Sequence, residues 1–278
     1  MARDDHGHAA HAAFLSNGRD IMTDAVSSSA LSIKGLLKHF EGKYAVDRLD
    51  LDIQGGEFHA LLGPNGAGKT TTLRIVAGLL KADAGQVSVL GHDVSRDPQV
   101  AKREMAFLPD DPLLYGKLSA LEYLEFVAGL WAIDANTAAN RATDLLKWLE
   151  LWDKADQQTE GYSRGMRQKL ALAGALIHQP KLMILDEPLT GLDAHAARSV
   201  KDMLVDYVKQ GNTIVLTTHI LEIAERLSGR ISIIQRGKIA AQGTLEELRE
   251  QAGQQGATLE DVFLNLTDAQ ASIPVADK

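Results

Sequence analysis

Hydrophobic and polar positions follow two different periods along this chain. Leu49, Leu51 and Ile53 alternate with polar residues, which predicts a strand with one buried face. Residues 57–62 form a largely apolar run that predicts a second strand, and residues 71–80 carry apolar side chains at helical spacing. We therefore expect strands at the start of the ordered part, followed by a glycine-rich loop and a helix.

The rest of the chain continues this alternation around one helical segment. From about residue 119 to residue 151 the spacing is helical, and its apolar side chains, including Phe126 and Trp148, are expected in the core of a helical insertion. A longer helix is expected over 196–210, and two short helices over 245–251 and 259–266. No internal repeat is visible, which predicts a single copy of the domain. Further strands are expected at 87–90, 105–108, 182–185, 213–217 and 231–234.

Composition narrows the class of protein. With 278 residues, of which 45% are hydrophobic and 24% charged, the chain has an ordinary globular composition. The absence of cysteine excludes disulfides and thiolate metal sites and fits a reducing compartment. The net charge of −8 argues against a nucleic-acid partner, because nonspecific binding depends on Lys and Arg neutralising phosphates. The most apolar windows, 124–133 and 170–177, are too short for a bilayer, so a membrane role requires docking to another subunit.

Residues 1–29 are expected to form a disordered N-terminal tail, because they are rich in Ala, Asp, Ser and His without sustained periodicity. They lack the basic start and apolar run of a signal peptide. His6, His8 and His11 offer a metal-binding alternative, but a solvated extension is the favoured interpretation. Met22 offers an alternative start of translation.

The glycine-rich loop carries the first chemical motif. Residues 63–70 match the P-loop pattern at every fixed position, after an apolar strand and before a helix. Glycines let successive backbone N–H groups point at phosphates, and the following helix adds its positive end. Lys69 is expected to reach the β- and γ-phosphates, and the Thr70 hydroxyl to ligate Mg²⁺. The predicted ATP-binding residues here are Gly63, Pro64, Asn65, Gly66, Ala67, Gly68, Lys69, Thr70 and Thr71.

A second motif follows the apolar run 182–185. Asp186 ends that predicted strand, where open α/β sheets place their ligand sites, and we expect it to hold Mg²⁺ through a water molecule. Glu187 is a candidate general base, because a carboxylate near bound phosphate and metal can accept a proton from water. The alternative, that both residues merely cap a strand, is disfavoured by the P-loop upstream.

Ser163 and Gly165 form a helix start shortly before that strand. Serine is a good N-cap, and glycine lets a backbone approach an anion closely. The helix expected over 166–177 presents free N–H groups at its positive end. The segment is therefore a candidate phosphate site, although alone it would be interpreted as an ordinary capped helix.

The order of these motifs resembles that of ABC transporter ATP-binding subunits, over roughly residues 31–267. The Ser163 segment is similar to their signature motif, and residues 181–187 to their Walker B strand. The resemblance implies an α/β P-loop NTPase of ABC type. Its parts would be a mixed-sheet core, an antiparallel β subdomain and a helical signature subdomain at about 98–178. The ATPase domain is then expected at 30–250, and a C-terminal helix and tail at 251–278.

The resemblance also implies roles for single residues. Glu187 would polarise the attacking water, His219 would be the switch histidine at the γ-phosphate, and Asp193 would belong to the D-loop that couples two active sites. Phe40 takes the place of an adenine-stacking aromatic residue, with Tyr44 as a weaker candidate. The implied catalytic residues are Glu187, His219 and Lys69.

The chain departs from the family pattern at two places. In the signature, Tyr162, Arg164 and Met166 replace Leu, Gly and Gln, whereas the Ser and the second Gly are retained. Asp110 stands where the family has a Gln that contacts Mg²⁺ and the lytic water. Because Asp is shorter, Asp110 is not counted as a ligand.

The function implied by the resemblance is ATP hydrolysis, with Mg²⁺, that powers a separate transmembrane permease. Two ATP-binding subunits, identical or different, would sandwich two nucleotides, each between one P-loop and the partner's Ser163 helix. Residues 109–112, 162–170 and 258–267 resemble the bacterial ABC-2-type exporter branch. The subunit would lie in the cytoplasm, on the cytoplasmic face of the cell membrane, with the permease docked near residues 110–124.

Two alternatives remain open. A soluble ABC-type ATPase acting on ribosomes or nucleic acid is one, but such proteins normally carry two cassettes, long coiled coils or zinc-binding cysteines, and this sequence shows none of them. A regulatory module that does not hydrolyse nucleotide is the other, and Glu187 and His219 argue against it.

Overall fold

The computed structural model describes residues 29–271, with side chains up to residue 267. The predicted tail, with His6, His8, His11 and Met22, lies outside the described residues apart from residue 29. The described residues form two compact units. We call residues 29–107, 181–187 and 205–271 the sheet unit, and residues 108–180 and 188–204 the helical unit.

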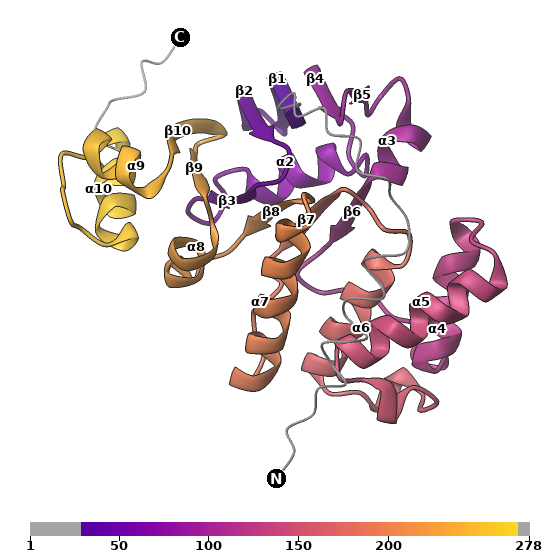
Figure 1. Ribbon diagram of the computed structural model, residues 1–278. Helices are drawn as coiled ribbons and strands as arrows, with labels where there is room; N and C mark the ends of the chain where they lie inside the picture. Colours follow the sequence, from indigo (N-terminus) through magenta and orange to yellow (C-terminus); the bar gives the residue numbers. More distant parts are fainter. Residues whose placement is uncertain (1–28, 272–278) are drawn as a thin grey trace. The chain divides into compact units, whose positions relative to one another are not determined.

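The sheet unit contains two β-sheets (Figure 1). The first has four strands in the order β2-β1-β4-β5 and is antiparallel throughout. Its strands are β1 (Ser29–Phe40), β2 (Lys43–Gln54), β4 (Ala84–Val89) and β5 (His92–Asp93). The second has six strands in the order β10-β9-β3-β8-β7-β6, in which β9, β3, β8 and β7 are parallel and β10 is antiparallel to β9. Its strands are β3 (Phe58–Leu62), β6 (Met105–Leu108), β7 (Leu182–Asp186), β8 (Thr213–Thr217), β9 (Arg230–Gln235) and β10 (Lys238–Gly243).

A helix that starts directly after the P-loop lies between these two sheets in Figure 1. This helix, α2 (Lys69–Val76), buries Leu73, Ile75 and Val76. They join one apolar cluster with side chains of both sheets, such as Leu31 and Ile184. Burying a side chain of this size stabilises the fold by roughly 1.5–3 kcal/mol, so the cluster holds the P-loop helix firmly in place.

Short helices follow the strands at either end of the chain. They are α3 (Pro98–Glu104), α8 (Leu221–Leu227), α9 (Leu245–Gln251) and α10 (Leu259–Ala271). Leu248 of α9 and Leu259 and Val262 of α10 form a second apolar cluster with Leu62 of β3 and Ile233 of β9. The C-terminal helices therefore pack on strands that flank the P-loop.

The helical unit is built from α4 (Ala120–Leu130), α5 (Ala135–Trp148) and α6 (Arg164–Leu176), with two 3₁₀ turns at Trp152–Lys154 and Thr159–Gly161. Helix α7 (Ala194–Lys209) begins in this unit and ends in the sheet unit. Each of the first three helices starts with a side-chain cap, from Ser119, Asp134 and Ser163 respectively. These caps satisfy N–H groups that the helices leave unpaired, so the sequence fixes each helix start locally.

Two sequence expectations need correction. Phe126 is 42% exposed and its ring meets that of Tyr115 at 5.3 Å, so the prediction that Phe126 is a core residue was wrong. It lies two positions after buried Leu124, which turns it about 200° around the helix. The helix expected over 71–80 ends at Val76, because the chain turns through Gly78 in the left-handed region.

None of the described helices is both long enough and apolar enough to cross a membrane. This finding concerns the described residues alone.

Candidate functional site

The P-loop connects the end of β3 to the first residue of α2. Its first glycine is required by packing: a β-carbon on Gly63 would overlap the carbonyl oxygen of Ile234 in β9 and lie 2.8 Å from the Ile234 Cγ2 atom. Asn65 and Gly66 are exposed, whereas Ala67 is buried. The loop is thus anchored against β9 by its base and open to a ligand at its tip.

Lys69 lies at the start of α2 with its ammonium group turned back over the loop. The Nζ atom donates hydrogen bonds to the Gly63 oxygen at 2.6 Å and the Pro64 oxygen at 3.1 Å. Burial lowers the pKa of Lys69, and the nearby Glu187 and Asp186 carboxylates oppose that shift. A half-buried ammonium beside two neutral carbonyls is suited to donate hydrogen bonds to the oxygens of a phosphate.

Asp186 ends β7 as predicted and lies beside Thr70. The Thr70 hydroxyl donates to Asp186 Oδ2 at 3.0 Å, and the Thr217 hydroxyl donates to Asp186 Oδ1. Asp186 is buried, with 4% of its surface exposed, whereas Thr70 is exposed. Hydroxyl and carboxylate oxygens are the ligands that Mg²⁺ prefers, so this donor set fits the ion.

Sequence reasoning missed the role of Thr217. β7 and β8 are parallel neighbours, and their register pairs Asp186 directly with Thr217. The two polar residues at the ends of adjacent strands were the available signal, because side chains in register on neighbouring strands lie close together.

Glu187 directly follows Asp186 but has a different backbone conformation. Its φ is 52°, in the left-handed region, which costs a non-glycine residue about 1–3 kcal/mol. Its amide N–H donates to the Thr217 oxygen at 3.1 Å. The Glu187 Oε2 atom lies 2.8 Å from Nδ1 of His219, which follows β8. Strained backbone therefore places the predicted base and the predicted switch histidine side by side.

In the helical unit, Ser163 is the N-cap of α6, as predicted. Its Oγ accepts a hydrogen bond from the Met166 amide at 3.2 Å. Gly165 lies against the segment that begins α7: a β-carbon there would meet Ala196 Cβ at 3.5 Å and Leu192 Cδ2 at 3.7 Å. The structure thus brings the predicted signature residues beside the predicted D-loop.

Asp193 caps the start of α7. Its Oδ1 accepts from the Ala196 amide at 2.9 Å, and this hydrogen bond is the main cause of its lowered pKa. In the folded chain Asp193 is therefore held as a carboxylate with a defined orientation.

The two aromatic candidates for adenine lie at the β1–β2 turn. Phe40 is 46% exposed and Tyr44 is 59% exposed, so both rings are accessible. Lys38 Nζ lies 5.2 Å from the centroid of the Phe40 ring. The neighbouring Ala45 places its carbonyl oxygen against Gly68 of the P-loop. The turn therefore adjoins the loop, and the adenine role of Phe40 remains a prediction.

Asp110 lies in the helical unit and is exposed. Its Oδ1 accepts a hydrogen bond from the Asp111 amide at 2.9 Å. This local contact occupies one carboxylate oxygen, and nothing adds Asp110 to the magnesium donor set.

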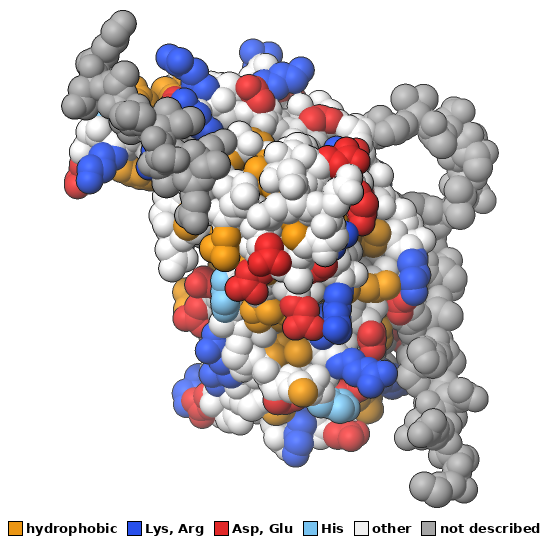
Figure 2. Space-filling model, turned by 90° about the vertical axis from the view of Figure 1, so that its left-hand side faces the viewer, with side chains coloured by type: hydrophobic (Ala, Val, Ile, Leu, Met, Phe, Trp, Pro, Cys, Tyr) orange, Lys and Arg blue, Asp and Glu red, His pale blue; other side chains and the backbone are white. Residues whose placement is uncertain are grey.

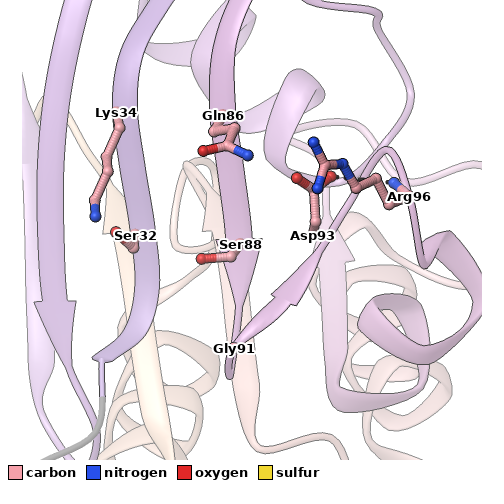
Figure 3. A pocket seen from close by; sticks show the side chains of 7 residues that line it. All are labelled: Ser32, Lys34, Gln86, Ser88, Gly91, Asp93 and Arg96. Carbon is pink, nitrogen blue, oxygen red and sulfur yellow. Dashed lines mark hydrogen bonds between the residues drawn. The ribbon is translucent and has the colours of Figure 1, made fainter.

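A polar pocket is lined by side chains of the four-stranded sheet (Figure 3). Cross-strand pairs such as Ser32 with Ser88 and Lys34 with Gln86 form its floor. None of the predicted site residues lines it. Buried and polar positions alternate along these strands, so the polar side chains that line the pocket lie on the solvated face of the sheet.

On the side of the described chain drawn in Figure 2, acidic and basic side chains are interspersed with apolar ones. A continuous basic stripe of the kind that tracks nucleic acid is not visible on that side of the described residues.

A P-loop, a carboxylate held by two threonine hydroxyls and a carboxylate–histidine pair at the ends of parallel strands are typical of a P-loop nucleotide hydrolase. Residues 46–190 match the model of the ABC transporter family, and the chain belongs to that family. The predicted family and fold class are confirmed.

Named relatives agree with this assignment. The chain is 39% identical over 228 residues to the daunorubicin resistance ATP-binding protein DrrA3 of Streptomyces coeruleorubidus, covering 82% of this chain and 72% of that protein. It is 32% identical over 243 residues to the ABC-type transporter ATP-binding protein EcsA of Bacillus subtilis strain 168, covering 87% and 98%.

Solved structures show the same fold. The ATP-binding subunit of an ABC transporter superposes with a TM-score of 0.81 at 31% identity, over 86% of this chain and 99% of that one. The ATP-binding cassette MJ0796, solved as a dimer in a post-hydrolysis state with ADP and Pi, has a TM-score of 0.70 at 27% identity, over 77% and 98%. The chain is therefore an ATP-binding and ATP-hydrolysing subunit of an ABC transporter, and the ribosomal or nucleic-acid alternative is not favoured.

Proposed function

We propose that this subunit hydrolyses Mg-ATP with Glu187 as general base and thereby powers an export permease. One observation carries the assignment of roles: Glu187 and His219 are in contact, beside an Asp186 carboxylate that Thr70 and Thr217 hold in place. Two adjacent carboxylates with different partners can take different roles, one as a metal ligand and one as a base.

The P-loop binds the phosphates in this account. Backbone N–H groups of residues 65–71 surround them, and Lys69 exchanges its contacts with the Gly63 and Pro64 carbonyls for the β- and γ-phosphate oxygens. Thr70 and Asp186 would hold Mg²⁺, and the ion would neutralise charge on the phosphates when bound. Phe40 stacks on the adenine ring from the adjoining turn.

Glu187 then accepts a proton from the attacking water. General base catalysis of this kind contributes about 10²–10⁴-fold in rate. His219, whose Nδ1 contacts Glu187, holds the carboxylate in place and donates to the γ-phosphate from its exposed side.

The helical unit completes the site of a second subunit. Ser163 and Gly165 present the positive end of α6 to the γ-phosphate held by the partner's P-loop, with Asp193 beside them. The chain has one P-loop and one signature segment, so two subunits form two sites. The dimeric structure of MJ0796 supports this arrangement.

Export is supported by the names of relatives. They include ATP-binding proteins for daunorubicin resistance and for Nod factor export. We infer that the chain docks to a separate permease of this exporter type at the cytoplasmic face of the membrane. The apolar side chains of residues 110–124 that stay exposed, Leu113 at 91% and Tyr115 at 59%, are suited to that contact.

Purification of the tagged chain from detergent-solubilised membranes tests the export assignment. We expect a polytopic membrane protein to co-purify and to raise the ATPase rate of the subunit. Leu113→Asp should abolish this recovery, whereas Leu264→Asp, at a 51% exposed position on α10, should leave it intact. Recovery of ribosomes or nucleic acid without a membrane protein would contradict the proposal.

A further inference from the structure

Arg164, which replaces a glycine of the family signature, lies against the backbone of the D-loop segment. A β-carbon on Gly191 would lie 2.6 Å from Nη1, 2.7 Å from Cζ and 2.9 Å from Nε of Arg164. Three such similar distances place the guanidinium group directly over the α-carbon of Gly191. Both residues belong to the helical unit.

The position is unfavourable for a cation by itself. Arg164 is the first residue of α6, where the helix dipole favours negative charge. Arg164 is also exposed, so burial does not account for a cation at this position. Its contact with Gly191 supplies a local reason, because a planar guanidinium can lie flat against backbone that carries no side chain, whereas a compact ammonium cannot.

Two independent features of the structure favour glycine at position 191. Its φ is 74°, in the left-handed region, where a side chain is strained. It also lacks the atom that would collide with Arg164. Two residues later, Asp193 caps α7. Arg164 therefore contacts the turn that precedes Asp193, and the conformation of this turn determines how the Asp193 carboxylate is oriented.

A second contact joins the same two segments. A β-carbon added to Gly165 would come within van der Waals distance of Leu192 and Ala196, so the backbone of Gly165 lies close to both side chains. The start of α6 is thus fixed to residues 191–196 at two adjacent points, one polar and one apolar.

We propose that Arg164 is a positioning residue that locks the D-loop turn to the signature helix start. The two segments then meet the partner subunit's nucleotide as one rigid surface. This inference rests on the proposed action of Ser163 in trans. It predicts that Arg164 affects closure of the dimer and leaves nucleotide binding to the subunit's own P-loop unchanged.

A double-mutant cycle tests the contact. In a Glu187→Gln background, sedimentation velocity gives the dissociation constant of the ATP-bound dimer, and a fluorescent ATP analogue gives the affinity of the monomer. Arg164→Ala should weaken dimerisation about 10-fold, in the range that coupled residues show, with nucleotide affinity within about twofold. Arg164→Lys should weaken dimerisation as Arg164→Ala does, because lysine lacks the planar guanidinium group.

With Arg164 present, Gly191→Ala should raise the dissociation constant of the dimer strongly. In the Arg164→Ala background the same substitution should raise it by a factor at least about threefold smaller, because the collision with the guanidinium is then removed. The matched controls are Gly253→Ala and Arg198→Ala. Gly253 has a φ of 66° with nothing within 4 Å of an added β-carbon, and Arg198 is 83% exposed on α7. Neither control should affect dimerisation or couple to Arg164.

Additive effects of Arg164→Ala and Gly191→Ala would overturn the inference, as would an Arg164→Ala dimer indistinguishable from Arg198→Ala. In both cases a dimerisation defect of Ser163→Arg would leave the proposed function standing. Dimerisation that neither Ser163→Arg nor Arg164→Ala disturbs would instead overturn the proposed action in trans.

Discussion

Asp186 and Glu187 are neighbours in sequence with the same functional group, yet their surroundings differ. Asp186 is buried and accepts hydrogen bonds from two threonine hydroxyls, which suits a fixed metal ligand. Glu187 follows in the left-handed region and contacts a largely exposed histidine, which suits the proposed role of a proton acceptor. The two roles proposed for these carboxylates therefore match the change of backbone conformation between Asp186 and Glu187.

Glu187→Gln tests the role of the base. We expect ATP affinity within about twofold of the wild type and turnover lower by about 10²–10⁴-fold, because the amide keeps the size but cannot take a proton. Steady-state phosphate release and fluorescent-nucleotide binding measure the two quantities. Glu160→Gln, at the exposed Lys117 pair, is the matched control. Turnover like that of the wild type in Glu187→Gln would contradict the assignment.

Thr217→Val tests whether the hydroxyl beside Asp186 orients the metal ligand. The substitution keeps the shape and removes the donor to Asp186 Oδ1, and it also frees that carboxylate to rotate. We expect the Mg²⁺ concentration for half-maximal ATPase activity to rise about 10-fold, in the range typical of residues that support metal ligands. Thr143→Val, on the outer side of α5, should leave it unchanged. An unaltered Mg²⁺ requirement in Thr217→Val would exclude this role.

At the scale of elements, strand β9 fixes the base of the P-loop. Gly63→Ala would push its β-carbon into the Ile234 carbonyl, so β9 or the loop has to move. Overpacking of this kind costs about 1–3 kcal/mol. We therefore expect Gly63→Ala to lower both the free energy of unfolding, measured with urea, and the affinity for ATP. Gly129→Ala in α4, where an added β-carbon meets nothing within 4 Å, should be neutral or stabilising by up to about 1 kcal/mol. Equal stability of the two variants would contradict the packing argument.

Elements with strong local signals could be predicted from the sequence. The strands at 105–108 and 213–217 were confirmed with the expected bounds, because apolar runs end there at polar or proline residues. Helix α9 was confirmed over 245–251, where Thr244 and Glu247 form a capping box. In contrast, β10 was not predicted: its residues Lys238–Gly243 include few strand formers, and pairing with β9 determines its conformation.

In the candidate site, too, some features could be predicted from the local sequence and others could not. Ser163 as an N-cap and Asp186 at a strand end follow from local patterns that the structure bears out. The contacts of Thr217 with Asp186 and of Arg164 with Gly191 join residues that are far apart in sequence. Strand register and the packing of loops decide such contacts, so neither could be derived from residue order alone.

At the scale of the whole molecule, the chain carries two half-sites in separate units. The P-loop, Asp186, Glu187 and His219 belong to the sheet unit, whereas Ser163 and Asp193 belong to the helical unit. In the proposed mechanism, the helical unit of one subunit acts on the nucleotide of another. The chemistry of ATP hydrolysis is then tied to the assembly of two chains.

Complementation between two inactive variants tests this central claim most directly. Lys69→Ala removes the phosphate-binding ammonium, and Ser163→Arg blocks the α6 start, so each variant alone should be inactive in ATP hydrolysis. Mixed together with Mg-ATP, they should recover activity, because the intact P-loop of one chain then meets the intact Ser163 helix of the other. A mixture that remains as inactive as its two components would contradict the account.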